Sequence, residues 1–121
     1  MRTIICGGRD YEFTFDDWKW LDGLRLSLPI TEVVSGKQSR YDTFKRRFVG
    51  ADYFGEKWEA KNNIAVEGFP AEWVHFGRSA GPRRNQEMAD YADACIAFPG
   101  GNGTADMVRR AREKNLRVIL R

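Results

Sequence analysis

The chain has 121 residues, which at the usual domain size of about 100 to 200 residues makes one compact domain and leaves little room for a second. Hydrophobic residues make up 42% of the chain and charged residues 31%, which excludes a disordered or collagen-like protein. The apolar runs are only a few residues long, so they exclude a membrane-spanning helix of roughly 20 residues. The formal net charge of +3 is concentrated between Lys37 and Arg47, where five basic residues accompany one acidic residue.

Short apolar segments alternate with amphipathic ones along the chain. Residues 3–6 form an apolar, β-branched run that Gly7-Gly8 ends, which is typical of a buried strand. Apolar side chains at helical spacing then predict a helix over 16–28, which Pro29 stops. The same reasoning predicts further strands at 30–34, 64–66, 94–98 and 116–120, and helices at 50–62, 82–91 and 102–114, the last capped by Asn102 and Thr104.

This alternation predicts a single Rossmann-like α/β domain, with a parallel sheet of about five strands and helices on both faces. Ligands bind such sheets outside the carboxyl ends of the strands. Glycines follow three of those ends, at Gly7-Gly8, at Gly36 and at 100–103. Glycine loops let backbone N–H groups approach an anion. They indicate a nucleotide phosphate site, but the chain has neither the GxGxxG nor the GxxxxGK[ST] motif.

The two cysteines and the first residues of the chain bear on its environment. Cys6 and Cys95 lie in apolar segments with no second Cys or His at metal-ligand spacing. This predicts buried, reduced thiols rather than a disulfide or a zinc site. The N-terminal sequence lacks the apolar stretch of a secretory signal. We therefore expect a cytoplasmic protein without membrane partners.

Several sequence blocks, taken in order, carry a family resemblance. They are GGRDY at 7–11, VSG at 34–36, GAD at 50–52, WVHFGRSAGPRRNQEM at 73–88 and AFPGGNGTADM at 97–107. Together they resemble the short YspA-like branch of the SLOG superfamily, over nearly the whole chain. That superfamily also includes the lonely-guy-type nucleotide phosphoribohydrolases, the DNA-processing protein DprA and domains that bind ADP-ribose-like signals. The resemblance implies a Rossmann-like fold with a nucleotide-derived ligand over the PGGxGT loop.

One departure from the resembled pattern concerns catalysis. The phosphoribohydrolase motif is PGGxGTxxE, with an arginine on the preceding helix; Arg84 matches the arginine, but Met107 stands in place of the glutamate. A thioether neither stabilises an oxocarbenium-like state nor activates water. Asp106 lies about 100° away around the helix and is better explained as a first-turn carboxylate that favours the helix dipole. Asp52, Glu87 and Asp10 remain alternative bases.

A second departure is an apparent insert at 37–49, which carries most of the positive charge. In the YspA-like branch the second strand leads directly through a glycine-rich segment into its helix. One interpretation makes the insert a basic lid whose cations meet phosphates; the other makes it a solvated loop or helix extension. In the helical version Tyr41, Phe44 and Phe48 form a buried stripe. The basic residues concerned are Lys37, Arg40, Lys45, Arg46 and Arg47.

The helix predicted to begin near residue 82 starts with two arginines. The helix dipole disfavours cations there, so we expect Arg84 to meet an anion and Arg83 to face solvent. Asn85 either hydrogen-bonds a ribose or base, or bridges two loops. His75 is interpreted as a packed or surface residue rather than a catalytic one, and Trp73 as a residue that closes the core more readily than it stacks on a base.

These arguments define the predicted site. Its ligand-binding and phosphate-binding residues are Gly7, Gly8, Arg9, Asp10, Ser35, Gly36, Lys37, Gly50, Asp52, Arg84, Asn85, Pro99, Gly100, Gly101, Asn102, Gly103 and Thr104. Its candidate catalytic residues are Arg84, Glu87, Asp106 and Asp52. No metal or cofactor is expected.

The first functional hypothesis is a module that binds a phosphate-bearing nucleotide derivative, such as an ADP-ribose-like or cyclic signal, without turning it over. Stand-alone members resembling this chain are common in bacteria and their phages, so sensing or sequestering a defence signal fits. The alternative is an N-glycosidase that releases base and ribose 5-phosphate with Arg84 and a substitute carboxylate. Whether the chain is an enzyme stays open between these two hypotheses.

A third hypothesis, DNA binding, rests on the sequence pI of about 9.0 and on the resemblance to DprA. It is the weakest of the three, because the charge lies in one insert rather than along a face with interleaved aromatic residues. The resemblance also implies a homodimer or higher homo-oligomer, since relatives often pair through their helices.

Overall fold

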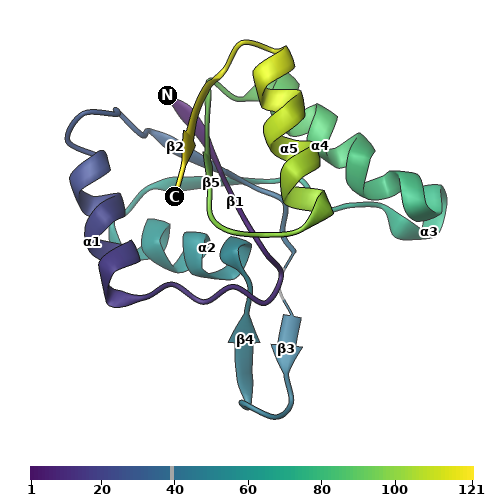
Figure 1. Ribbon diagram of the computed structural model, residues 1–121, viewed down its shortest axis with the longest axis horizontal. Coiled ribbons are helices and arrows are strands. Elements are labelled where there is room, and N and C mark those ends of the chain that lie inside the picture. Colours follow the sequence, from purple (N-terminus) through teal and green to yellow (C-terminus); the bar gives the residue numbers. More distant parts are fainter. Residues whose placement is uncertain (39) are drawn as a thin grey trace.

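The computed structural model describes residues 1–38 and 40–121, and its centre is a parallel sheet (Figure 1). The strand order is β5-β2-β1-β6-β7, and every neighbouring pair is parallel. The strands are β1 (Arg2–Cys6), β2 (Glu32–Ser35), β5 (Ala65–Gly68), β6 (Ala94–Ala97) and β7 (Arg117–Leu120). The chain moves outward from β1 on one side and returns to β6 on the other. The order therefore reverses between β1 and β6, which is where open α/β sheets place their ligands.

Helices cover both faces of this sheet. The helices α1 (Phe15–Leu24) and α2 (Ala51–Lys61) lie on one face, and α4 (Ala80–Tyr91) and α5 (Asn102–Glu113) pack side by side on the other (Figure 1). A short helix α3 (Trp73–Phe76) and the 3₁₀ turn η1 (Gly77–Ser79) lead into α4. The prediction of a Rossmann-like α/β domain with helices on both faces is confirmed.

Two apolar cores follow from the alternation of side chains along the central strand. Ile5 points toward α1 and α2, where it joins a core around the fully buried Trp58. Ile4 and Cys6 point the other way, into a core that includes Met88 of α4 and Met107 of α5. Because β1 is buried on both faces, its sequence is a continuous apolar run rather than an alternating one.

The helix α4 begins at Ala80 rather than at residue 82, and α1 and α5 also differ from the sequence predictions. The first helix ends at Leu24 rather than at residue 28; it begins with a capping box, in which Asp17 N donates to Thr14 Oγ1 and Thr14 N donates to Asp17 Oδ2. The last helix has Gly101 as its N-cap and no side-chain cap, so the prediction of capping by Asn102 and Thr104 is wrong. A helix N-terminus without a side-chain cap leaves its first N–H groups for another acceptor.

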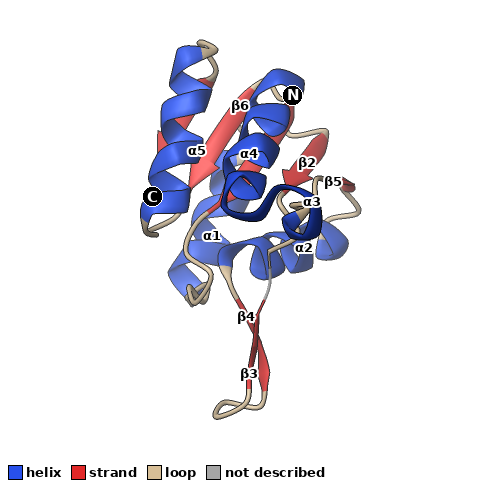
Figure 2. Ribbon diagram, turned by 90° about the vertical axis from the view of Figure 1, so that its right-hand side faces the viewer, coloured by secondary structure: helices blue, strands red, loops and turns tan. Residues whose placement is uncertain are grey.

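The segment expected as a lid or a helix extension contains a β-hairpin. Its strands β3 (Arg40–Asp42) and β4 (Arg47–Val49) are antiparallel and project from the body of the molecule (Figure 2). The tip is a turn in which Asp42 Oδ1 accepts hydrogen bonds from two backbone N–H groups, those of Phe44 and Lys45. A helix with a buried aromatic stripe is therefore wrong, and Phe44 is 97% exposed. Ser39 of the insert lies outside the described residues.

Among the residues that the structure describes, no helix has the length and apolar character needed to cross a bilayer. The prediction of buried thiols is confirmed, because Cys6 and Cys95 are both buried and free. Their sulfur atoms lie 3.9 Å apart on neighbouring strands.

Candidate functional site

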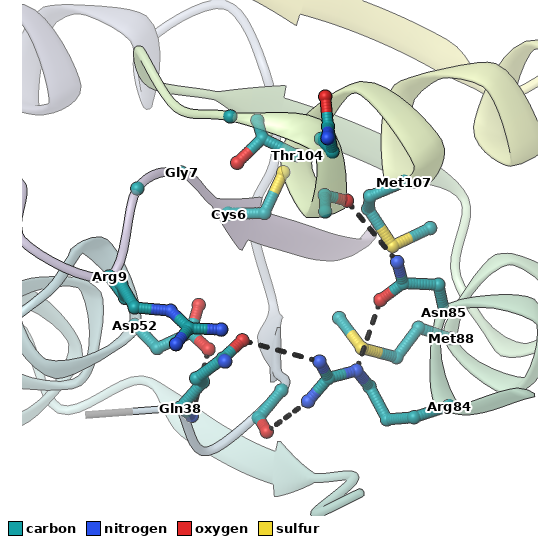
Figure 3. Close-up of a pocket in the computed structure, with 15 residues that line it drawn as sticks. Cys6, Gly7, Arg9, Gln38, Asp52, Arg84, Asn85, Met88, Thr104 and Met107 are labelled. Carbon is teal, nitrogen blue, oxygen red and sulfur yellow. Dashed lines mark hydrogen bonds between the residues drawn. The ribbon is translucent and has the colours of Figure 1, made fainter. Parts of the chain in front are cut away.

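A polar cavity opens at the carboxyl ends of β1 and β6, where the strand order reverses (Figure 3). Its volume is about 300 Å³. The loops after β1, β2 and β6 and the helices α2, α4 and α5 all contribute to its walls. The prediction that three glycine loops converge at one edge of the sheet is confirmed by the cavity's lining residues Gly7, Gly8, Gly36, Gly101 and Gly103.

Most of the predicted site residues line this cavity. Besides the five glycines, these are Arg9, Asp52, Arg84, Asn85, Asn102 and Thr104. Their convergence depends on backbone hydrogen bonds between loops. Gly8 N donates to Pro99 O at 2.8 Å, and Ala51 N donates to Gly8 O at 3.0 Å. These bonds join the loop after β1 to the loop after β6 and to the start of α2.

The other predicted residues lie outside the cavity lining. Asp10 is exposed and forms an ion pair with Arg40, with 2.6 Å between Nη2 and Oδ1. Ser35 is buried, and its hydroxyl donates to Glu56 Oε2 at 3.3 Å. Lys37 forms an ion pair with the same glutamate. The contacts of Asp10, Ser35 and Lys37 therefore lie outside the cavity, at the surface and at the end of β2.

Gly50, Pro99 and Gly100 also lie outside the cavity. Gly50 precedes α2 with a φ of +117°, and its N–H donates to Tyr11 O at 3.1 Å, so it turns the chain into the helix. Pro99 and Gly100 line a separate open groove on the other side of the loop after β6, together with apolar residues of α5 and β7. Their backbones position the loop without facing the cavity.

Gly100 is required by a close approach within the loop. A Cβ atom at this position would overlap Thr104 Oγ1 and lie 2.7 Å from Gly8 N. At Gly101, by contrast, a Cβ atom would meet nothing within 4 Å. Gly100 therefore allows the loops after β1 and β6 to touch.

We predict that Gly100→Ala lowers the free energy of unfolding by about 1–3 kcal/mol, the usual cost of overpacking, and that Gly101→Ala leaves it within about 0.5 kcal/mol. Urea unfolding followed by tryptophan fluorescence measures both values. Equal stabilities for the two variants would show that the contact between the loops does not need a glycine at position 100.

Arg84 is a buried cation that faces the cavity. Only 8% of its surface is exposed. Its guanidinium donates to Gly36 O at 2.5 Å, to Asn85 Oδ1 at 3.0 Å and to Gln38 Oε1 at 3.4 Å (Figure 3). All three acceptors are neutral. Burial lowers the pKa of Arg84, and the nearby Asp52 carboxylate opposes that shift.

Asp52 brings a carboxylate with a perturbed pKa to the same cavity. It is 9% exposed, and its Oδ2 accepts a hydrogen bond from Gln38 N at 2.9 Å. Burial raises its pKa to about 6, although the Gln38 N–H and the Arg84 charge act in the opposite direction. At neutral pH this carboxylate can exchange a proton with a bound molecule.

The other catalytic candidates lie outside the cavity. Glu87 is exposed on α4. Asp106 accepts hydrogen bonds from Arg109 Nη2 at 2.7 Å, Arg110 Nε at 2.9 Å and Asn85 Nδ2 at 3.0 Å. Burial alone would raise the pKa of Asp106, but these donors lower it. Asp106 thus acts as a fixed anion that orients Asn85, while Met107 occupies the cavity wall.

The basic residues of the insert do not line the cavity. Arg40 pairs with Asp10, and Lys45 and Arg47 pair with Glu12. Among the described residues of the insert, Gln38 alone lines the cavity, and it is not among the site residues predicted from the sequence. The solvated interpretation of the insert is therefore the one that agrees with the structure.

No protein-family model, curated protein or solved structure matches this chain.

Three sulfur-bearing residues outside the predicted set, Cys6, Met88 and Met107, also line the cavity. The sequence signal that could have indicated the two methionines is their helical spacing from predicted site residues. Met88 lies four residues after Arg84 and Met107 three after Thr104, so each shares a helix face with a predicted site residue. His75 and Trp73, at the exposed helix α3, are absent from the cavity lining.

Proposed function

We propose that this chain binds a phosphate-bearing, nucleotide-derived small molecule in the cavity between β1 and β6. The observation that carries the proposal is the buried Arg84 guanidinium, which faces a cavity lined by glycine loops; within the described part of the chain it donates its hydrogen bonds to neutral acceptors, and the Asp52 carboxylate lies nearby. A buried cation with neutral partners is stabilised when an anion joins it.

The start of α5 provides the second half of an anion site. The cavity is lined by Gly101, Asn102, Gly103 and Thr104, and this helix begins without a side-chain cap. The first-turn N–H groups of a helix have no partner within the helix, and the helix dipole favours an anion at this end. A phosphate between this turn and Arg84 would accept hydrogen bonds both from the first-turn N–H groups and from the guanidinium.

The size and the remaining polar groups favour one nucleotide unit. A cavity of about 300 Å³ is at the small end of ligand pockets, which span about 300–1,000 Å³. Asp52 and Gln38 supply a carboxylate and an amide for ribose hydroxyls or base N–H groups. A module of this kind would sense or sequester its ligand. Membership of the SLOG superfamily is part of the proposal and rests on the sequence blocks around these same loops.

Isothermal titration calorimetry tests the proposal with three probes: adenosine 5′-monophosphate, adenosine and inorganic phosphate. We expect the monophosphate to bind, and to bind at least about tenfold more tightly than adenosine, because the phosphate meets Arg84 and the α5 N-terminus. Equal affinity for the nucleotide and the nucleoside, or heat from neither, would contradict a phosphate site. Parallel titrations with ADP-ribose and a cyclic nucleotide identify the derivative preferred.

A second candidate function, N-glycoside hydrolysis, is favoured by Asp52 alone. In this reaction water attacks C1′ of the ribose, the C1′–N bond breaks, and the departing base nitrogen keeps the electron pair and takes up a proton. A carboxylate with a pKa of about 6 is suited to accept the proton of the attacking water.

We expect Asp52→Asn to abolish any release of base from nucleoside monophosphates, measured by chromatography, while ligand binding persists. The matched control is Glu87→Gln, on the exposed surface of α4. Release at the same rate by both variants would exclude Asp52 as the base, and intact nucleotide after long incubation with the unmodified protein would leave binding as the function.

A further inference from the structure

The projecting hairpin and the adjacent helix α2 carry a continuous row of aromatic rings. Tyr41 and Phe48 are cross-strand partners whose rings lie 5.2 Å apart. Phe48 stacks on Tyr53 of α2 at 5.6 Å with an interplanar angle of 25°. Tyr41 and Phe48 are each about half exposed, 49% and 47%, and Phe44 at the tip is 97% exposed. These partly exposed rings lie on or beside the hairpin that projects from the body of the molecule (Figure 2).

Two shallow hollows flank the stacked pair of Phe48 and Tyr53. One, of about 350 Å³, is bordered by Lys37 and Lys57. The other, of about 380 Å³, is bordered by Lys57 and Lys61 and has Trp18 in its wall. Each hollow therefore combines an aromatic wall with lysine side chains, and the first also contains Glu56, the ion-pair partner of Lys37.

The charge of this face is positive. Residues 37–61 contain seven Lys and Arg against four Asp and Glu, and Asp10 and Glu12, which pair with Arg40, Lys45 and Arg47, reduce this formal +3 to +1. Two of the four acids, Asp52 and Glu59, are buried, and burial raises the pKa of both. Lys57 lies 5.4 Å from the Tyr53 ring centroid. The remaining acids, Asp42 and Glu56, are held by Arg40 and Lys37.

We propose that the aromatic and lysine-rich face formed by the hairpin and α2 binds a single-stranded polynucleotide, with bases stacked on the exposed rings and phosphates against the lysines. Stacking on aromatic side chains within a positive groove is the general way in which proteins hold single strands without reading sequence. The cores of protein–protein interfaces are depleted of lysine, whereas here lysines border each hollow. The face is separate from the nucleotide cavity, so this proposal does not depend on the proposed function.

Fluorescence anisotropy with labelled oligothymidylate and oligouridylate of about 20 nucleotides tests the proposal. We expect binding to both probes at about 50 mM salt, and a steep loss of affinity toward about 200 mM salt. The double variant Phe48→Ala/Lys57→Gln should bind at least about tenfold more weakly. Because one phosphate contact is removed, the slope of log affinity against log salt should fall by about 0.7.

A matched control is available on α1, where Lys19 lies 5.4 Å from the ring of Phe15, itself 75% exposed. Phe15→Ala/Lys19→Gln removes the same two residue types and the same charge outside the two hollows, and should bind as the unmodified protein does. Equal weakening by both double variants would show nonspecific electrostatic attraction and overturn the proposal.

A single variant at the hairpin tip, Phe44→Ser, guards against misfolding, because that ring is almost fully exposed; we expect at least about threefold weaker binding. Absence of binding to either probe at low salt contradicts the proposal. So does a concentration-dependent dimer in gel filtration that Phe48→Ala dissociates, because it would assign the same rings to a protein interface.

Discussion

Replacing Arg84 by alanine should weaken the binding of adenosine 5′-monophosphate by about 100-fold or more, since losing one partner of a buried charge pair costs roughly 2–5 kcal/mol. The guanidinium is buried, donates to Gly36 O at 2.5 Å and faces the cavity. The loss of affinity should be much smaller for adenosine, which has no phosphate to bind the guanidinium. Calorimetric titration of the variant with both ligands measures the two effects.

The neighbouring Arg83 is the control for that experiment. It is exposed on α4, its guanidinium lies 4.3 Å from the Phe76 ring centroid, and its Nε donates to Ser79 Oγ. Arg83→Ala should therefore bind the nucleotide normally. Arg84→Lys should fall between the two, because lysine keeps the charge but not the planar fork of donors. If both alanine variants bound equally well, Arg84 would have no role in holding an anion.

Replacing Glu59 by methionine should raise the free energy of unfolding at pH 8 by an amount on the order of 2–4 kcal/mol. Glu59 lies on α2 with 0% exposure, and neither of its carboxylate oxygens has a hydrogen-bond partner among the described residues. Burial raises its pKa to about 8, the nearby Glu56 adds to the shift, and Lys37 opposes it. The folded state therefore carries a buried acid that resists ionisation.

The sign of the pH dependence follows from that raised pKa. Below about pH 4.5, the ordinary value for this group, Glu59 is protonated in both states and contributes no pH dependence. Between pH 4.5 and about 8 the unfolded chain releases the proton while the folded chain retains it, so stability falls as pH rises, by up to roughly 1.4 kcal/mol per pH unit. Above about pH 8 the contribution levels off. Asp52, with a pKa raised to about 6, adds a similar fall that ends near pH 6.

Urea unfolding between pH 6.5 and 8 isolates the Glu59 contribution. We expect the unmodified protein to lose stability across this interval, and Glu59→Met and Glu59→Gln to lose the slope. Glutamine should give the smaller gain in stability, because its buried amide still lacks partners. Glu87→Met, at an exposed position of α4, should leave both the slope and the stability unchanged. A slope that persists in Glu59→Gln would show that another group titrates.

The fold was predictable because its signals are local. Apolar runs such as 3–6 and 94–98 are ended by glycine or proline, so both the strands and their carboxyl ends are visible in the sequence. The insert was not predictable in the same way. Its aromatic residues, three or four apart, suit a helix, yet Asp42 forms a turn with the N–H groups of Phe44 and Lys45, and this turn pairs Tyr41 with Phe48. A side-chain hydrogen bond within a turn leaves no periodic signal.

The cavity lining was predictable where a residue directly follows a strand or stands near the start of a helix. Gly7 and Gly36 follow strand ends, and Arg84 was indicated by its place in the first turn of a helix, where the dipole disfavours a cation. Gln38 was missed because its place depends on two distant contacts, from its N–H to Asp52 and from its side chain to Arg84. Lys37 was predicted as a site residue, but for a similar reason it lies outside the cavity lining. Sequence shows a cation after a strand, but not the carboxylate of Glu56 that holds it on the surface.

The most direct test of the phosphate site is a nuclear magnetic resonance titration of ¹⁵N-labelled protein with adenosine 5′-monophosphate. The backbone amide signals of Gly36, Gly101, Asn102 and Gly103 and the Arg84 Nε–H signal should shift together with one dissociation constant. They belong to three separate segments, the loop after β2, the start of α5 and the helix α4, which meet at the cavity. Shifts confined to the hairpin or to the groove beyond Pro99, with these amides unchanged, would contradict the account.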